Sequence, residues 1–174
     1  EDQSTVVTLS GSDIDGDNLS FTVGSATNGT LELSGSLVTY TPNLDYNGND
    51  SFTFTVSDGS ESSSASVSLS VSAVNDAPVL ASVSDVSFDE DGTTSTSLSA
   101  SDVDGDNLTF SITEGTDIVA SLSGSDISFS APADFNGSEE FTVSVSDGTV
   151  SDSQSITVTV NAVNDAPVAN ATSG

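Results

Sequence analysis

The sequence predicts an all-β protein made of two tandem Greek-key β-sandwich domains, the first of which lacks its opening strand. The first observation behind this is a two-residue alternation of apolar side chains with Ser and Thr, as in Phe52–Ser57, which is typical of strands with one solvated face. The second is a repeat that matches the chain to itself at an offset of 89 residues. No apolar run has the length and period of a helix.

The alternation predicts the strands one by one in the second copy, and turn-forming pairs such as Asn47-Gly48 and Asp58-Gly59 mark where strands end. Short strands packed this densely indicate a sandwich of the immunoglobulin-like class. The expected strands of the second copy are 79–88, with a break allowed within it, 95–99, 107–113, 117–122, 126–130, 139–146 and 154–162.

The repeat sets the domain organisation. Glu1-Asp2 aligns with Glu90-Asp91, and Ala73–Val79 aligns with Ala162–Val168. The first copy has no counterpart of Val79–Phe88. We therefore predict a truncated first domain at 1–76, a second domain at 77–164, and a linker or opening strand of a following repeat at 165–174.

The composition excludes several kinds of partner. The chain has 27 acidic residues, no Lys, Arg or His, and a net charge of −27, so its side chains form no salt bridges with one another. Nucleic acids and anionic membrane surfaces require basic residues and are not expected partners. The counter-charge must come from divalent cations, a salty medium or a basic partner. The apolar fraction of 34%, concentrated in alternating runs, favours folded domains over disorder.

The composition also argues against an enzyme. The absence of Cys, Lys, Arg and His removes thiol nucleophiles, catalytic triads, lysine chemistry and histidine-based metal sites. Only a glycosidase with two carboxylates remains conceivable. Such a site should occur once, whereas the acidic motifs occur in both copies. No apolar stretch approaches the roughly 18 residues that span a membrane.

An acidic loop of the form D-x-D-G-D-x-L occurs once in each copy, at Asp13–Leu19 and Asp102–Leu108. Three carboxylates within five residues repel one another unless a cation lies among them, and hard oxygen ligands favour Ca²⁺. A solvated acidic turn is the alternative. The loop does not fit an EF-hand, because the position of the bidentate Glu holds Gly24 or Thr113. The candidate ligands are Asp13, Asp15 and Asp17 in the first copy and Asp102, Asp104 and Asp106 in the second.

Together, these motifs resemble the cadherin repeat, in particular the cadherin-like tandem domains of giant bacterial surface adhesins. Asp102-Val103-Asp104 resembles the D-x-D loop of that family, and Asp147-Gly148 its x-D-x-G element. Leu44–Asn47 is similar to the L-D-R-E motif, Glu90 to an early glutamate, and Asn75–Pro78 to the linker motif. The resemblance covers nearly all of both copies.

The resemblance implies Ca²⁺ held jointly by the base of one repeat, the linker and the loops of the next. Ser72 and Asn161 stand where the family has the first linker Asp, and Asn47 stands where it has Glu. One or two ions per junction are therefore expected rather than three. The implied ligands are Glu1, Asp45, Asn47, Asn75, Asp76, Asp102, Asp104 and Asp147 at the central junction, Asp13, Asp15 and Asp58 toward a preceding repeat, and Glu90, Asp134, Asn136, Asn164 and Asp165 toward a following one.

The expected function is that of a structural extender in an extracellular repeat array, located at a cell surface or in secreted matrix and stiffened by Ca²⁺. A module that binds a glycan or a cell-surface protein is the alternative, which an exposed Tyr40 or Tyr46 would favour. The expected partners are adjacent repeats of the same chain, with self-association into fibres by strand addition through residues 165–174 as a second route.

Overall fold

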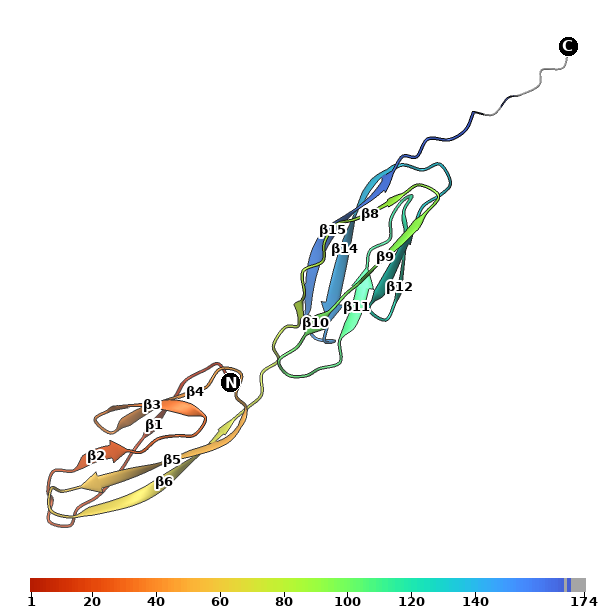
Figure 1. The fold of residues 1–174 in the computed structure, drawn as a ribbon. Coiled ribbons are helices and arrows are strands. Elements are labelled where there is room, and N and C mark those ends of the chain that lie inside the picture. Colours follow the sequence, from red (N-terminus) through yellow and green to blue (C-terminus); the bar gives the residue numbers. More distant parts are fainter. Residues whose placement is uncertain (168, 170–174) are drawn as a thin grey trace. The chain divides into compact units, whose positions relative to one another are not determined.

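The computed structural model describes residues 1–167 and 169, and these contain strands but no α-helix. The all-β prediction is therefore confirmed for the described part of the chain. The fold separates into two compact units, Glu1–Val74 and Asn75–Gly174, each of which is described by itself below (Figure 1). No helix long and apolar enough to cross a membrane occurs among the described residues.

The first unit consists of two three-stranded antiparallel sheets. One sheet has the strand order β1-β4-β3 and the other β2-β5-β6. The strands are β1 (Thr5–Thr8), β2 (Ser20–Val23), β3 (Gly29–Ser34), β4 (Leu37–Pro42), β5 (Gly48–Ser57) and β6 (Ser62–Val71).

The second unit repeats this architecture and adds strands to it. Its sheets have the orders β11-β14-β15-β8, β12-β13-β9 and β10-β7, and β8 runs parallel to β15. The strands are β7 (Val79–Leu80), β8 (Val86–Asp89), β9 (Thr93–Ser97), β10 (Ala100–Ser101), β11 (Thr109–Ile112), β12 (Val119–Ser123), β13 (Asp126–Ser130), β14 (Gly137–Ser146) and β15 (Ser151–Asn161).

The predicted opening segment 79–88 is broken, as allowed, into β7 and β8. Several predicted ends were off by two or three residues. The strand expected at 95–99 lies at Thr93–Ser97, and the one expected at 154–162 begins at Ser151. The short β10 was missed, because a two-residue strand exists only through its pairing with β7 and leaves no periodic pattern of its own.

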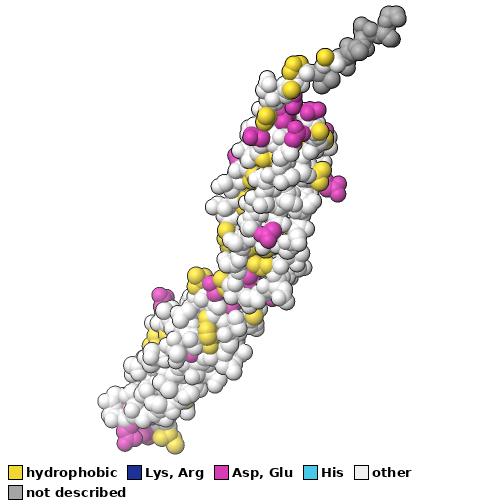
Figure 2. All heavy atoms as spheres, turned by 45° about the vertical axis from the view of Figure 1, so that its right-hand side comes forward, with side chains coloured by type: hydrophobic (Ala, Val, Ile, Leu, Met, Phe, Trp, Pro, Cys, Tyr) yellow, Lys and Arg dark blue, Asp and Glu magenta, His cyan; other side chains and the backbone are white. Residues whose placement is uncertain are grey.

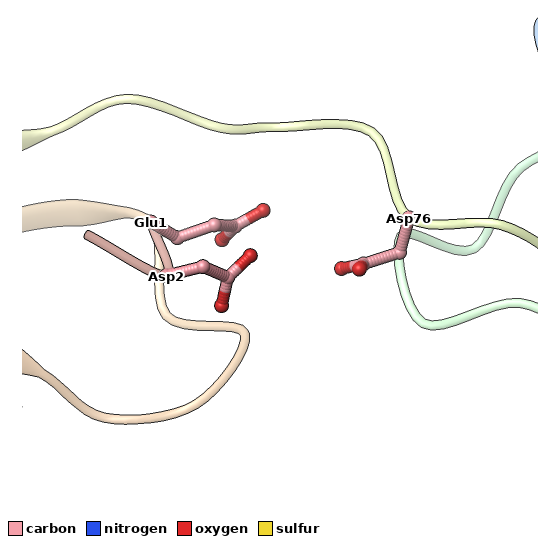
Figure 3. A group of neighbouring side chains, drawn as sticks. All are labelled: Glu1, Asp2 and Asp76. Atoms are coloured by element: carbon pink, nitrogen blue, oxygen red, sulfur yellow. The ribbon is translucent and has the colours of Figure 1, made fainter.

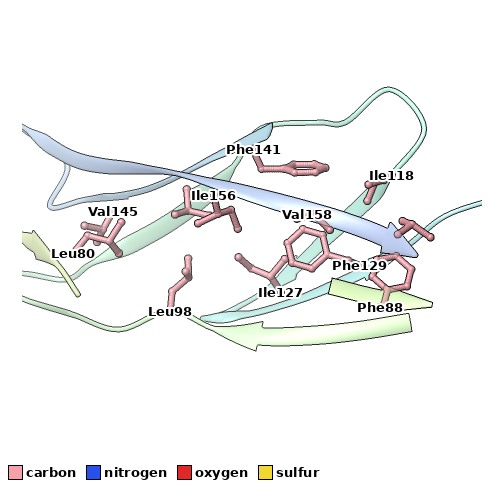
Figure 4. Packing of buried hydrophobic residues seen from close by; sticks show 12 residues of the cluster. Leu80, Phe88, Leu98, Ile118, Ile127, Phe129, Phe141, Val145, Ile156 and Val158 are labelled. Atoms are coloured by element: carbon pink, nitrogen blue, oxygen red, sulfur yellow. The ribbon is translucent and has the colours of Figure 1, made fainter. Parts of the chain in front are cut away.

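The alternating apolar positions form the core of the second unit (Figure 4). Phe141, Val143 and Val145 on β14 are fully buried, because every second side chain of the strand faces the opposite sheet. The rings of Phe129 and Phe141 meet edge to face at 5.5 Å. The first unit has its own smaller cluster around Val38 and Phe52.

One loop of the first unit is held by a buried acid. The carboxylate of Asp50 accepts hydrogen bonds from the backbone N–H groups of Thr27, Asn28 and Ser51 and from the Tyr40 hydroxyl at 3.0 Å. Burial alone would raise the pKa of Asp50, but these hydrogen bonds outweigh it and lower the pKa. Burial, followed by the hydrogen bond to Asp50, raises the pKa of Tyr40 to about 12.

The register of β14 and β15 places the acidic motifs at opposite ends of the second unit. Ser146 pairs with Ser151 at one end, and Gly137 pairs with Val160 at the other. The Asp102–Asp106 loop leads into β11, whose first residue pairs with Ser146, so we call this end the crown. The turn before Gly137 and the exit from β15 lie at the other end, which we call the base.

Candidate metal centre

The crown of the second unit brings three acids together. Asp102, Asp104 and Asp106 each offer a carboxylate oxygen, and these oxygens lie within 4.8 Å of one another. Gly105 adopts a positive φ of 76°, a conformation that an L side chain rarely takes and glycine takes freely. This turn reverses the direction of the loop, so that the carboxylates of Asp102, Asp104 and Asp106 approach one another.

One carboxylate oxygen of this loop has the surroundings expected of a cation ligand. Asp102 Oδ2 is buried and has no hydrogen-bond partner among the described residues. A buried carboxylate oxygen without a partner is costly, whereas a cation would compensate it directly. The donor set consists of carboxylate oxygens alone, which suits Ca²⁺ or Mg²⁺ and not a metal that prefers nitrogen or sulfur.

The linker into the second unit joins the crown. The backbone N–H of Asp76 donates to Asp104 Oδ2 at 2.8 Å, and Asn75 Nδ2 donates to Asp147 Oδ2 at 2.8 Å. The hydrogen bond from Asn75, followed by those from the N–H groups of Val150 and Thr149, lowers the pKa of Asp147. These contacts hold Asp76 against the loop and Asn75 against Asp147; the role of the three residues as ligands stays a prediction.

The base of the second unit carries a second acidic group. Asp91, Asp134 and Asp165 offer carboxylate oxygens within 4.8 Å of one another. Asp91 and Asp134 have φ values of 63° and 60°, and left-handed conformations at residues other than glycine cluster at functional sites. Repulsion from Asp134, followed by burial and the charges of Glu90 and Asp91, raises the pKa of Asp165.

Glu90 anchors the outgoing linker at this base. Its side chain is 8% exposed and accepts hydrogen bonds from the Val163 N–H and from Asn136 Nδ2. Asn164, by contrast, turns its amide back to the carbonyl of Asp165 at 3.1 Å. The side-chain amide of Asn164 is therefore occupied within the linker itself.

The first unit repeats the anchor at its own base. Glu1 accepts hydrogen bonds from the Val74 N–H at 3.0 Å and from Asn47 Nδ2 at 3.4 Å. Figure 3 shows Glu1 and Asp2 projecting side by side from the first unit; Asp76, also drawn there, belongs to the second. Asp2 and Asp45 share the left-handed backbone of Asp91 and Asp134, with φ values of 61° and 57°.

The acids at the crown of the first unit are engaged in turns. Asp13 Oδ1 accepts hydrogen bonds from the N–H groups of Asp15 at 2.8 Å and Asp17 at 3.1 Å. Asp58 Oδ1 accepts from Glu61 and Ser60, and these bonds lower the pKa of Asp58. Among the described residues, neither Asp13, Asp15, Asp17, Asp58 nor Asp45 belongs to a group of three acids within 4.8 Å. The second unit has the same backbone contacts, from Asp106 to Asp102 and from Thr149 and Val150 to Asp147, and the role of the acids of the first crown as ligands stays a prediction.

The sequence reasoning missed Asp2 and Asp91. Both follow a predicted glutamate directly and align at the repeat offset, so the repeat itself was a signal that could have found them. Acidic side chains gather at the base of the second unit and at one end of the first (Figure 2).

Removal of one acid from the base cluster should shift the melting temperature in opposite directions with and without Ca²⁺. Because repulsion raises the pKa of Asp165, the folded state binds that proton more readily than the unfolded state, and the ionised cluster opposes folding at neutral pH. Asp134→Asn should therefore raise the melting temperature in chelator. In Ca²⁺ it should weaken metal binding on the order of tenfold, because a charged ligand is lost, and should lower the melting temperature.

Asn suits this test because it tolerates the left-handed backbone of position 134. Glu140→Gln removes the same charge from an exposed position of β14 outside the acidic groups, and is the matched control. Differential scanning calorimetry in both media gives the result. If Asp134→Asn and Glu140→Gln shifted the melting temperature equally and in the same direction in both media, a cation site at the base would be contradicted.

The fold has known relatives. A family model described as Bacterial Ig domain matches residues 1–70 and 75–161. No curated protein matches the sequence significantly. Among solved structures, Drosophila N-cadherin EC1-4 matches with a TM-score of 0.61 and 20% identity over 91% of this chain and 44% of that one. Human protocadherin-24 EC1-2 matches with a TM-score of 0.55 and 17% identity over 92% of this chain and 88% of that one.

An endo-fucoidan hydrolase of glycoside hydrolase family 107 matches at 24% identity over 94% of this chain and 27% of that one, with a TM-score of only 0.42, which supports no conclusion. The cadherin-like prediction is confirmed as a fold. The family match covers each copy of the repeat, and the chain therefore belongs to the bacterial Ig domain family.

Proposed function

We propose that the chain is a structural extender segment of an extracellular repeat array, such as an adhesin, a matrix protein or a fibre, and that Ca²⁺ at the ends of its repeats stiffens it. It acts at a cell surface or in secreted matrix, and it is not an enzyme. The family match and the cadherin-like fold support the part of the proposal that makes the chain an extracellular repeat module.

The observation that carries the proposal is the contribution of linker residues at both ends of the second unit. Asp76 and Asn75 contact the acids of the crown, and Asp165 lies among the acids of the base. A cation bound at either end would therefore hold a linker against the repeat. Without it, the clustered charges repel one another and the linker is free to move.

Ca²⁺ fits these clusters better than Mg²⁺. The two groups use exposed or half-buried carboxylates on loops, and Ca²⁺ accepts six to eight oxygen ligands in flexible geometry, whereas Mg²⁺ demands near-ideal octahedral geometry. Backbone carbonyls and water would complete the coordination shell. The number of clustered acids supports one or two ions per junction.

The alternative, a glycan-binding module, has less support. Tyr40 is 1% exposed and Tyr46 donates its hydroxyl proton to the Asn49 carbonyl at 2.7 Å. Tyr40 therefore provides no surface for stacking on a sugar, and the chain contains no Trp.

Small-angle scattering on the whole chain tests the extender function. In Ca²⁺ we expect the double variant Asp102→Asn/Asp104→Asn to sample more bent conformations and to have a shorter mean maximum dimension than the parent. Each unit should keep its fold, since both substitutions lie in a loop outside the hydrophobic cores.

The matched control is Glu114→Gln/Glu140→Gln, which removes two charges from the same unit at exposed positions outside the acidic groups. Chelator should reduce the mean maximum dimension of the parent to about that of the double loop variant. It should change the maximum dimension of the double loop variant little. A maximum dimension that is insensitive to both Ca²⁺ and the loop substitutions would reject the stiffening role.

A further inference from the structure

One groove occurs at the same place in both units. In the first unit a cavity of about 550 Å³ is lined by Leu19, Ser20, Phe21, Leu33, Gly35 and Ser36. In the second unit a cavity of about 490 Å³ is lined by Leu108, Thr109, Phe110, Leu122, Gly124 and Ser125. These are the same positions at the 89-residue offset, and only Ser20 differs in type from its counterpart. Both copies of the repeat therefore keep the groove.

Each groove lies where the two sheets of a unit end next to each other. β2 is the last strand of the β2-β5-β6 sheet and β3 is the last strand of the β1-β4-β3 sheet, and β11 and β12 hold the same places in the second unit. Within the part of the chain that the structure describes, no strand pairs with the outer edge of any of these four. An unpaired edge presents backbone N–H and C=O groups to an incoming strand.

In the first unit the backbone of Phe21 and Val23 points to the open edge of β2. The Gly24 N–H donates to the Thr53 carbonyl at 2.9 Å, which continues the register of β2 with β5. Successive residues of an antiparallel pair alternate between bonding to the partner strand and facing away from it. The N–H and C=O groups of Phe21 and Val23 therefore face away from β5.

The second unit repeats this arrangement. The Thr113 N–H donates to the Thr142 carbonyl at 3.0 Å and continues the register of β11 with β14. By the same alternation, Phe110 and Ile112 turn their N–H and C=O groups to the open edge of β11.

The side chains of the groove suit an apolar occupant. Phe21 and Leu33 pack against the core of the first unit, and Phe110 and Leu122 against the core of the second, yet all four remain half-buried. None of the lining residues of either groove is charged. Apolar and aromatic walls with a few polar groups are typical of binding sites.

Acids lie beside one end of each groove. Leu19 and Leu108 are the last residues of the two D-x-D-G-D-x-L loops, and Leu19 also lines a neighbouring cavity with Asp13, Asp58 and Glu61. The net charge of −27 without a basic side chain makes two copies of the chain repel each other and attracts a positively charged segment. A few bound Ca²⁺ ions would compensate only a small part of this charge.

We propose that each groove binds one extended segment of a partner protein, in which apolar residues alternate with basic residues. The segment adds a strand to the outer edge of β2 in the first unit and of β11 in the second. Its apolar side chains enter the groove, and its backbone pairs with the N–H and C=O groups of Phe21 or Phe110. Strand addition of this kind gives affinity through the backbone and specificity through alternate side chains. The surface gives the extender a lateral partner, which its structural role does not require.

Titration of model peptides into the whole chain tests the proposal. The probe is an end-blocked peptide of alternating Val and Lys, added in Ca²⁺ at physiological ionic strength. Alternating Ser and Lys keeps the charge without the apolar side chains, and alternating Val and Glu reverses the charge. We expect two Val-Lys peptides to bind per chain, to shift the NMR amide signals of Phe21 and Phe110, and to bind at least tenfold more tightly than either control peptide.

A substitution in the first unit separates the two grooves. Val23→Pro removes an N–H that faces the open edge, a place where a strand tolerates Pro. Val23→Ala truncates the same side chain and keeps the N–H, and is the matched control. Val23→Pro should lower the stoichiometry from two peptides to one and leave the shift at Phe110 unchanged, whereas Val23→Ala should keep both sites.

The fold of each variant can be checked in the unit that carries the substitution. Both tyrosines of the chain, Tyr40 and Tyr46, belong to the first unit, so the melting transition followed by Tyr emission reports on that unit. If Val23→Pro does not fold, the pair Ile112→Pro and Ile112→Ala tests the second groove in the same way, with the shift at Phe21 as the one that should remain.

Several results would overturn the proposal. Equal binding of the Ser-Lys peptide would show charge attraction alone, and equal binding of the Val-Glu peptide would exclude a basic partner. Absence of Val-Lys binding, or binding without shifts at Phe21 and Phe110, would reject the groove. Self-association of the chain that the peptide displaces would make a second copy the occupant. Strand addition through residues 165–174 of another copy stays a separate prediction, because residues 168 and 170–174 lie outside the described residues.

Discussion

Removal of Ca²⁺ is expected to lower the melting temperature of the chain by a large margin. A ligand that binds only the folded state stabilises it by about 4 kcal/mol at a thousandfold excess over its Kd, and each kcal/mol moves the midpoint of a domain this small by about 4–8 °C. The physical reason is the net charge of −27 without a basic side chain, together with the close grouping of three acids at the crown and three at the base of the second unit.

General screening by salt has to be separated from specific binding. Calorimetry in millimolar CaCl₂ should therefore be compared with MgCl₂ at the same concentration and with NaCl at the same ionic strength. We expect Ca²⁺ to stabilise most, because Mg²⁺ gives up its water reluctantly and monovalent salt acts only by screening. Identical midpoints in chelator, Mg²⁺ and Ca²⁺ would exclude a specific calcium site.

Phe141→Ala should destabilise the second unit by about 3–5 kcal/mol, the usual cost of truncating a buried aromatic side chain. Phe141 is fully buried and meets the ring of Phe129 edge to face at 5.5 Å, so the substitution removes both the buried area and the ring contact and leaves a cavity. Circular dichroism should show a melting transition for the second unit at a lower temperature.

The first unit should not respond, because its core is a separate cluster. Tyrosine emission, which reports on the first unit alone, should keep its midpoint in Phe141→Ala. The matched variant Phe52→Ala substitutes the equivalent position of the first unit, where the side chain is 2% exposed, and should move the Tyr transition instead. If Phe141→Ala shifts the Tyr midpoint by as much as the circular dichroism midpoint, the two units do not melt independently.

Local pattern was sufficient to predict most of the fold. Alternation of apolar residues with Ser and Thr placed β14 and β15 to within three residues. Side chains of a strand point alternately to the two faces of a sheet, so a two-residue period identifies a strand with one buried face. The repeat then carried each assignment to the other copy. Strand ends and the two-residue β10 were not predicted, since they depend on pairing partners distant in the sequence.

The candidate site was predicted less completely. The aspartates of the crown stand close together in sequence, and the structure brings Asp102, Asp104 and Asp106 within 4.8 Å. The base cluster draws Asp91 and Asp134 from two separate turns and Asp165 from the linker after β15. Asp91 was overlooked although it aligns with Asp2 at the repeat offset, and only the fold shows that it lies beside Asp134 and Asp165.

The sequence by itself determined the sandwich class, the two copies and the acidic motifs, because alternation, repetition and composition follow from the order and kinds of residues and do not depend on which segments pair. Only the tertiary structure decided which acids meet. In both copies the first Asp of the D-x-D-G-D loop accepts a hydrogen bond from the backbone N–H of the third, Asp13 from Asp17 and Asp102 from Asp106. In the second copy Asp104 also accepts a hydrogen bond from the linker, and Asp102 retains a buried oxygen without a partner among the described residues. The two loops differ in their hydrogen bonds because a carboxylate accepts from whichever donors lie near it. Those donors come from segments that the fold brings together.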